Sequence, residues 1–250
     1  MFRKKIVIAN WKMNPNSMRE ASSLFSEIKS FGRKYSASIV ICPPYPFISS
    51  LSEKISSDVS LGSEDVSFLK QGAHTGEVSA KMLASLRVSY CIVGHSERRK
   101  LGETNELVAE KISNLLGEKI HPILCIGEKE RDTEGLFFNI IREELILSLS
   151  KVSKNQISNV VIAYEPLWAI STEGKGAMEP KAIHETVIFI RKVLSDKFGK
   201  SPASKVKIIY GGSVDGKNAH EVIKEGECDG VLVGKASLNS KTFEAIVSAV

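Results

Sequence analysis

The chain has 250 residues, 42% hydrophobic and 25% charged, which is enough for one large core, and we expect residues 1–250 to form a single domain. The net charge of +5 comes from 34 basic and 29 acidic residues mixed along the sequence, which excludes the concentrated basic face of a nucleic-acid-binding protein and suits a small anionic ligand. No apolar run approaches the length of a membrane span, and the run after the charged start is too short for a signal peptide core.

Short apolar runs alternate with amphipathic stretches along the whole chain. Eight runs are strand candidates, and most lack polar alternation, which is typical of strands buried on both faces of a parallel sheet. They are KIVIAN (5–10), SIVIC (38–42), VSLGS (59–63), SYCIVG (89–94), HPILCIG (121–127), VVIAYE (160–165), KVKIIYG (205–211) and GVLVG (230–234).

The stretches between these runs carry helix signals. Ser17 and Glu20 form a capping-box pattern before apolar residues at positions 24, 28 and 31, and Thr104 precedes the same spacing at positions 108, 112 and 115. Further helices are expected over residues 44–57, 80–87, 136–152, 180–198, 216–225 and 238–250.

Eight repeats of strand and helix in 250 residues predict an α/β protein with a closed eight-stranded parallel (β/α)8 barrel, the TIM-barrel fold. An open doubly wound sheet shares the alternation and ranks second, because the first strand–helix turn lacks the pattern G-x-G-x-x-G.

The four cysteines are scattered without a C-x-x-C pair, and three lie in apolar runs: Cys42, Cys91, Cys125 and Cys228. This usage predicts buried, reduced thiols in a cytoplasmic protein and neither a disulfide framework nor a zinc site.

Polar residues and glycines follow the ends of several strands. In a parallel barrel these ends share one rim, where enzymes with this fold build their active sites. The residues are Asn10 and Lys12, His95, Glu165, Gly211-Gly212-Ser213 and Gly234. No set of metal ligands appears among them, so we expect one base, one imidazole, one ammonium group and two glycine-rich turns to face a common cavity.

Glu165 ends an apolar run directly before Pro166, where the strand must stop, and we expect the following Trp168 to be exposed. A carboxylate between an apolar wall and a loop loses part of its hydration, which favours proton abstraction from carbon. An ion pair with a surface lysine explains Glu165 equally well when this segment is taken alone.

The other residues also have ordinary explanations. Lys12 fits a solvated lysine and His95 a core histidine, and glycine serves many tight turns. However, the SERR run after His95 predicts a helical turn, whose amino terminus disfavours the imidazolium ion. Two glycine turns at adjacent strand ends suggest a phosphate site. These ordinary explanations do not account for the position of Lys12, His95, Glu165 and the glycine turns on the same rim.

Five motifs resemble those of the triosephosphate isomerase family, in the same order. They are NWKMN (10–14), VGHSERR (93–99), CIGE (125–128), AYEPLWAI (163–170) and YGGSV (210–214). The resemblance covers nearly the whole chain. It implies an isomerase of glycolysis and gluconeogenesis that interconverts dihydroxyacetone phosphate and D-glyceraldehyde 3-phosphate without a cofactor or metal.

The resemblance also implies residue roles. Glu165 moves a proton between the two substrate carbons, His95 polarises the carbonyl and shuttles protons between the oxygens, and Lys12 supplies positive charge with Asn10 assisting. Glu97 is implied to lie near Lys12, although an ion pair with a neighbouring arginine explains it as well.

Substrate binding is implied for Asn10, Lys12, Ser171, Ser213, Gly234 and Lys235, and residues 166–177 resemble a lid that closes over the phosphate. The loop from Gln71 to Ser79 resembles one that inserts into a second subunit, which implies a homodimer in which Thr75 supports Asn10 and Lys12 of the other chain.

Three features depart from the family pattern. Ser171 stands where glycine is usual, and the segment after it is about two residues longer. Gly234 is followed by Lys235 instead of glycine, which would strain the backbone if that position needs a positive φ. The segment after Arg99 is one residue short.

Two other functions fit the sequence less well. A phosphate-binding lyase or aldolase would need a Schiff-base lysine within a strand or a metal cluster on the rim, and the sequence shows neither. A barrel retained only for binding or assembly should have lost Lys12, His95 or Glu165, and all three are present.

Overall fold

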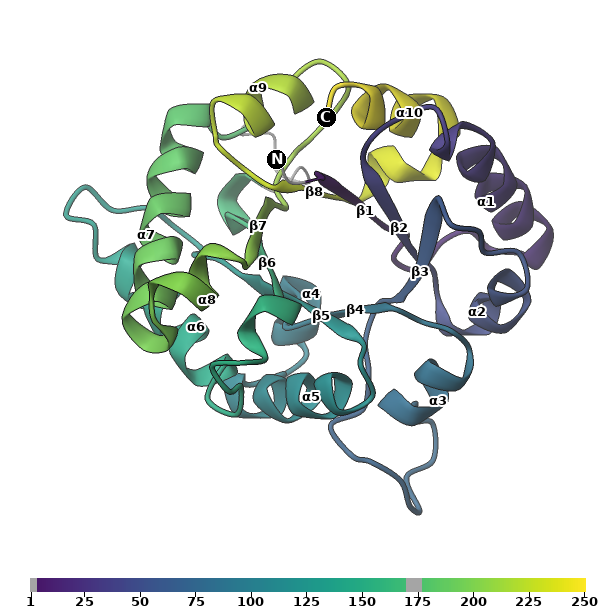
Figure 1. Cartoon of the computed structure of the whole chain (residues 1–250), viewed down its shortest axis with the longest axis horizontal. Coiled ribbons are helices and arrows are strands. Elements are labelled where there is room, and N and C mark those ends of the chain that lie inside the picture. The colour runs from purple at the N-terminus through teal and green to yellow at the C-terminus, as the bar shows by residue number, and fades with distance from the viewer. Residues whose placement is uncertain (1–3, 170–176) are drawn as a thin grey trace.

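The protein is described by a computed structural model that covers residues 4–169 and 177–250. Within this part of the chain, eight parallel strands close into a barrel in chain order, with β1 paired to both β2 and β8 (Figure 1). The strands are β1 Ile6–Asn10, β2 Ser38–Cys42, β3 Val59–Ser63, β4 Tyr90–Val93, β5 His121–Ile126, β6 Val161–Tyr164, β7 Lys207–Tyr210 and β8 Gly230–Val233. The closure confirms the predicted TIM barrel and rules out the open doubly wound sheet.

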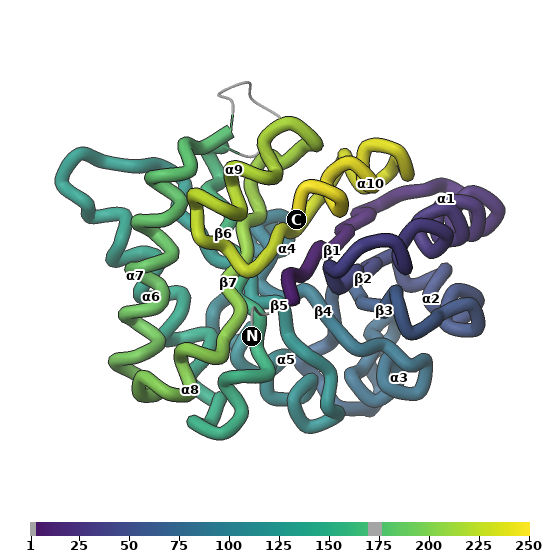
Figure 2. The backbone as a smooth tube through the Cα atoms, turned by 45° about the horizontal axis from the view of Figure 1, so that its top comes forward, coloured from purple at the N-terminus to yellow at the C-terminus, as the bar shows by residue number. Residues whose placement is uncertain are grey.

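The helices form an outer layer around the strands (Figure 1). The α-helices are α1 Met18–Gly32, α2 Tyr45–Ser52, α3 Ala80–Ser85, α4 Ser96–Lys100, α5 Asn105–Gly117, α6 Phe137–Ser148, α7 Pro180–Phe198, α8 Lys200–Ser204, α9 Ala219–Lys224 and α10 Ser240–Ser248. Short 3₁₀ helices are η1 Ile157–Asn159, η2 Leu167–Ala169 and η3 Lys235–Leu238. The last helix, α10, lies beside α1 and so completes the ring (Figures 1 and 2).

Local capping explains where several helices begin. The Ser17 hydroxyl accepts a hydrogen bond from the Glu20 backbone N–H, as the capping pattern predicts. The helix predicted over 216–225 begins later, because the Asp215 carboxylate accepts from two backbone N–H groups and holds a turn instead. The helix predicted over 238–250 is divided into η3 and α10 by Asn239, whose side chain caps the second piece.

The core has two layers because successive strand residues face opposite sides of the sheet. In β1, Val7 and Ala9 pack outward under the helices, whereas Ile6 and Ile8 fill the barrel interior. The described part of the chain contains no helix long and apolar enough to cross a membrane.

All four cysteines are buried and free. Burial raises the pKa of the Cys42, Cys91 and Cys125 thiols, so these side chains act as small apolar groups in the core.

Candidate functional site

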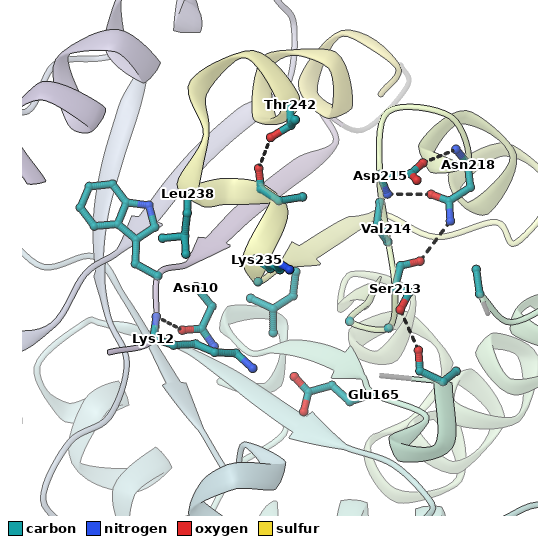
Figure 3. A pocket seen from close by; sticks show the side chains of 18 of the residues that line it. Asn10, Lys12, Glu165, Ser213, Val214, Asp215, Asn218, Lys235, Leu238 and Thr242 are labelled. Atoms are coloured by element: carbon teal, nitrogen blue, oxygen red, sulfur yellow. Dashed lines mark hydrogen bonds between the residues drawn. The ribbon is translucent and has the colours of Figure 1, made fainter. Parts of the chain in front are cut away.

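A cavity of about 980 Å³ opens at the carboxyl ends of the strands. Residues at the ends of five different strands line it, and Figure 3 shows Lys12 and Glu165 pointing toward its centre. The predicted site residues among them are Asn10, Lys12, His95, Glu165, Ser213, Gly234 and Lys235, with Gly211 and Gly212. The barrel thus brings to one pocket groups that are up to 225 positions apart in the sequence.

Glu165 lies directly after β6 and is almost completely buried, with 2% of its surface exposed. Its backbone N–H donates to the Ile126 carbonyl at 2.8 Å, which continues the parallel pairing one residue past the strand. Two glycines make room for it. A Cβ at Gly127 would lie 1.9 Å from the Glu165 carbonyl oxygen, and one at Gly211 would lie 2.7 Å from its Cγ. The carboxylate therefore has a narrow, fixed slot facing the cavity.

His95 precedes α4 and faces Glu165 across the pocket floor. Its Nε2 lies 3.4 Å from Glu165 Oε1. Its Nδ1 accepts a hydrogen bond of 3.2 Å from the Glu97 backbone N–H at the start of α4. Because a backbone N–H can only donate, Nδ1 carries no proton, and the neutral ring bears its proton on Nε2. The imidazole can therefore donate a hydrogen bond into the pocket.

Lys12 is held in an unusual backbone conformation, with φ of 56°. Buried Asn10 supports it, since Asn10 Oδ1 accepts from the Lys12 backbone N–H at 3.1 Å. The Lys12 ammonium lies 2.7 Å from Glu97 Oε1, so Glu97 pairs with Lys12, and no ion pair with an arginine is found for it among the described residues. A non-glycine residue in this region of φ is strained, and such strain concentrates at functional sites.

The pKa of Glu97 reflects this contact. Partial burial opposes ionisation, but the hydrogen bond and charge of Lys12 outweigh it and lower the pKa of Glu97 below its ordinary value. Glu97 is therefore a carboxylate that neutralises part of the charge of Lys12.

The turns after β7 and β8 form a nest of free backbone donors. Within the described part of the chain, the backbone N–H groups of Gly212, Ser213, Gly234 and Lys235 donate to no protein acceptor. The side-chain hydroxyl of Ser213, in contrast, is engaged, because it donates to the Ala169 carbonyl at 2.9 Å. Adjacent free N–H groups at a pocket wall bind anions such as phosphate.

Lys235 fits this turn without backbone strain. Among the described residues other than glycine, a positive φ occurs only at Lys12, Arg87, Lys119 and Glu227. Any residue can therefore adopt the backbone conformation found at Lys235, and the backbone strain that a positive φ would cause is absent there.

Two predictions fall on residues that the structure does not describe. Ser171 lies outside the described residues, as does most of the segment 166–177 that resembles a lid. Pro166 and Ala169 at the beginning of that segment are buried.

Trp168 is half-buried, so the sequence-based prediction of an exposed side chain is wrong. Its Nε1 donates to Glu128 Oε1 at 3.0 Å, and the Tyr164 hydroxyl donates to the same oxygen at 2.8 Å. Arg131 adds a third contact at 3.0 Å to this fully buried carboxylate. This cluster fixes the end of β6 and the beginning of the following loop.

Sequence reasoning assigned no role to Glu128 or Glu64. Glu64 follows β3 at the same rim, and its Oε1 is buried without a hydrogen-bond partner. Burial raises the pKa of Glu64 to about 8, and the charge of Glu97 adds to the rise, whereas Lys12 opposes it. Both glutamates directly follow apolar runs, as Glu165 does, and this position in the sequence is the signal that could have identified them.

Comparison with known proteins agrees with this arrangement. The family model described as triosephosphate isomerase matches residues 5–250. A triosephosphate isomerase of Clostridium botulinum (strain Okra / Type B1) is 40% identical over 249 residues, which cover 98% of this chain and 99% of the relative. Those of Alkaliphilus oremlandii (strain OhILAs) and Carboxydothermus hydrogenoformans are also 40% identical, over 250 and 248 residues, with 98% of this chain and 99% and 98% of the relatives covered. The chain belongs to the triosephosphate isomerase family.

Proposed function

We propose that this protein interconverts dihydroxyacetone phosphate and D-glyceraldehyde 3-phosphate, as an isomerase of glycolysis and gluconeogenesis. The reaction moves one proton between two adjacent carbons and a second proton between their oxygens. The observation that carries the proposal is the contact of 3.4 Å between Glu165 and a neutral His95 in a pocket that also holds a nest of backbone N–H groups.

Glu165 acts as the base in this mechanism. Its carboxylate removes a proton from the carbon next to the substrate carbonyl, which leaves an enediolate, and then returns the proton to the neighbouring carbon. The buried slot supports this role, because a poorly hydrated carboxylate needs less desolvation before it reaches a C–H bond.

His95 and Lys12 act on the oxygens. The Nε2 proton of His95 binds the carbonyl oxygen where negative charge develops and is exchanged between the two oxygens. Lys12 stabilises the enediolate through its ammonium group, and Asn10 keeps Lys12 in place through the hydrogen bond of 3.1 Å.

The phosphate binds at the turns after β7 and β8, through the N–H groups of Gly212, Ser213, Gly234 and Lys235. Ser171 and the lid segment 166–177 would complete this side of the site. A closed lid excludes water and protects the enediolate from losing phosphate.

A coupled assay of triose phosphate interconversion on purified protein tests the proposal. The protein should first be treated with a chelator, which is then kept in the assay. Full activity would exclude the metal-dependent lyases and aldolases and the binding-only barrel. Absence of turnover in both directions would contradict the proposal.

Replacing His95 by glutamine should lower kcat on the order of a hundredfold. Glutamine keeps a donor in the pocket but cannot pass a proton between the oxygens. The affinity for inorganic phosphate, measured by its competitive inhibition, should change less than about twofold. An equal loss of phosphate affinity would instead indicate that the pocket no longer assembles.

We also infer a homodimer through the loop from Gln71 to Ser79. Its residues 71–77 are exposed, and the segment between β3 and α3 extends away from the barrel (Figure 1). In the dimer, Thr75 of one subunit would contact the partner subunit's Asn10 and Lys12. Sedimentation equilibrium should give twice the mass of the chain, and deletion of residues 72–76 should give the monomer mass and lower activity. A wild-type monomer at micromolar concentration would contradict the inference.

The cytoplasm is the proposed location, in keeping with four free thiols and a role in glycolysis. No cofactor enters the proposed reaction, and the described residues contain no group of three or more His, Cys, Asp or Glu side chains arranged to hold a metal ion.

A further inference from the structure

Lys235 adds a second ammonium group to the end of the pocket where the phosphate is proposed to bind. It is the first residue of η3 and lines the pocket. Figure 3 shows it between Lys12 and Asn10 on one side and Ser213 on the other. Because its own backbone N–H belongs to the nest, its flexible four-carbon side chain begins next to the bound anion and can fold onto it.

Lys12 and Lys235 differ in how much of their charge is available. The Lys12 ammonium is 2.7 Å from Glu97 Oε1, so a carboxylate already neutralises part of its charge. Lys235 is exposed, and none of the ion pairs between described residues includes it. Lys235 is therefore the less neutralised of the two lysines in the pocket wall.

Neither of the two carboxylates among the described residues of the pocket wall forms an ion pair with Lys235. Asp215 also lines the pocket, but its Oδ1 accepts hydrogen bonds of 2.8 and 3.1 Å from the backbone N–H groups of Lys217 and Asn218. Glu165, the other carboxylate of the wall, lies against His95. An anion in the nest would thus find neutral N–H donors and one ammonium without a carboxylate partner.

We propose that Lys235 determines the affinity of this pocket for phosphate dianions. Its ammonium binds the phosphate directly and supplies positive charge that Lys12, which is paired with Glu97, does not supply in full. The inference rests on the proposed function for the identity of the substrate, whereas the anion chemistry follows from the pocket. The phosphate is remote from the carbons that react, so Lys235 contributes equally to binding of the substrate and of the transition state. Its loss should therefore appear in KM and not in kcat.

The test compares Lys235→Met, Lys235→Arg and Lys241→Met with the wild type. Methionine keeps the length and packing of the stem but removes the charge, and arginine restores the charge. Lys241 is the matched control, because it is exposed at the start of α10 beside the pocket residue Thr242 but does not line the pocket. Melting curves show whether each variant is folded.

Lys235→Met should raise KM and the dissociation constant of inorganic phosphate roughly three- to tenfold at low salt, with kcat within about twofold. The difference from wild type should shrink as ionic strength rises, because salt screens an exposed charge. Lys235→Arg should restore most of the affinity, and Lys241→Met should leave it unchanged.

Three results would overturn the inference. They are unchanged phosphate affinity in Lys235→Met, an equal loss in Lys241→Met, or a parallel fall of kcat that arginine does not restore. Calorimetric titration with inorganic phosphate separates this inference from the proposed function, since it requires no turnover. A wild type that binds phosphate through Lys235 but does not isomerise triose phosphates would contradict the proposed function alone.

Discussion

Replacing Glu165 by aspartate should lower kcat on the order of a hundredfold, with little effect on folding. The shorter side chain withdraws the carboxylate by one methylene group from the slot formed around Gly127 and Gly211. The contact of 3.4 Å with His95 Nε2 would lengthen accordingly. In the proposed mechanism, the carboxylate would then remain in the pocket but lie too far from the substrate carbon for efficient proton transfer.

Steady-state kinetics in both directions would measure this loss, with KM for the triose phosphate changing only a few fold. Glu165→Gln provides the comparison, because it keeps the length of the side chain and removes the base, and it should be slower than Glu165→Asp. Melting temperature and the inhibition constant of inorganic phosphate serve as controls. Unchanged turnover in Glu165→Asp would exclude this residue as the base.

Replacing Glu64 by glutamine should stabilise the protein strongly at alkaline pH. The carboxyl group is largely buried near Lys12 and Glu97, and burial raises its pKa from the ordinary 4.5 to about 8. One of its oxygens has no hydrogen-bond partner. The folded state therefore keeps the proton of Glu64 over a range of pH in which the unfolded chain has already lost it.

Proton linkage determines how the stability of the wild type changes with pH. Between pH 4.5 and about 8 the folded state binds more protons than the unfolded state, so stability falls as pH rises through this window. Above the window, the ionised carboxylate costs on the order of 3 to 4 kcal/mol. Glutamine has a similar shape and no charge, so it removes this cost. Below pH 4.5 the carboxyl is neutral in both states, and the two proteins should be about equally stable.

Urea unfolding at pH 5 and at pH 9 would measure the effect. The free energy of unfolding of Glu64→Gln should exceed that of the wild type by about 3 kcal/mol at pH 9, which corresponds to a melting temperature roughly 6 to 12 °C higher. At pH 5 the difference should be less than about 1 kcal/mol. Glu53→Gln, at an exposed site after α2, is the matched control and should change neither value. The same gain at both pH values would show that burial of an ionised carboxylate is not its cause.

The fold could largely be predicted from local patterns. Eight apolar runs, most of them without polar alternation, indicated a parallel sheet, and the helix expected over 180–198 is α7 with the same bounds. Ser17 capped its helix as its spacing to Glu20 predicts. These features depend on residues close together in the chain, so the sequence shows them directly. Helix ends were less well predicted, since side chains such as Asp215 compete for the backbone N–H groups.

The grouping of Lys12, His95 and Glu165 followed from one topological rule, because residues after parallel strands meet at the same rim of a barrel. Their contacts did not follow from it. The pairing of Lys12 with Glu97, the buried Glu128 below Trp168 and the unpartnered carboxyl of Glu64 depend on which distant segments pack against each side chain. Hydration, charge and hydrogen-bond distance at these residues are properties of that packing, and local sequence patterns do not encode them.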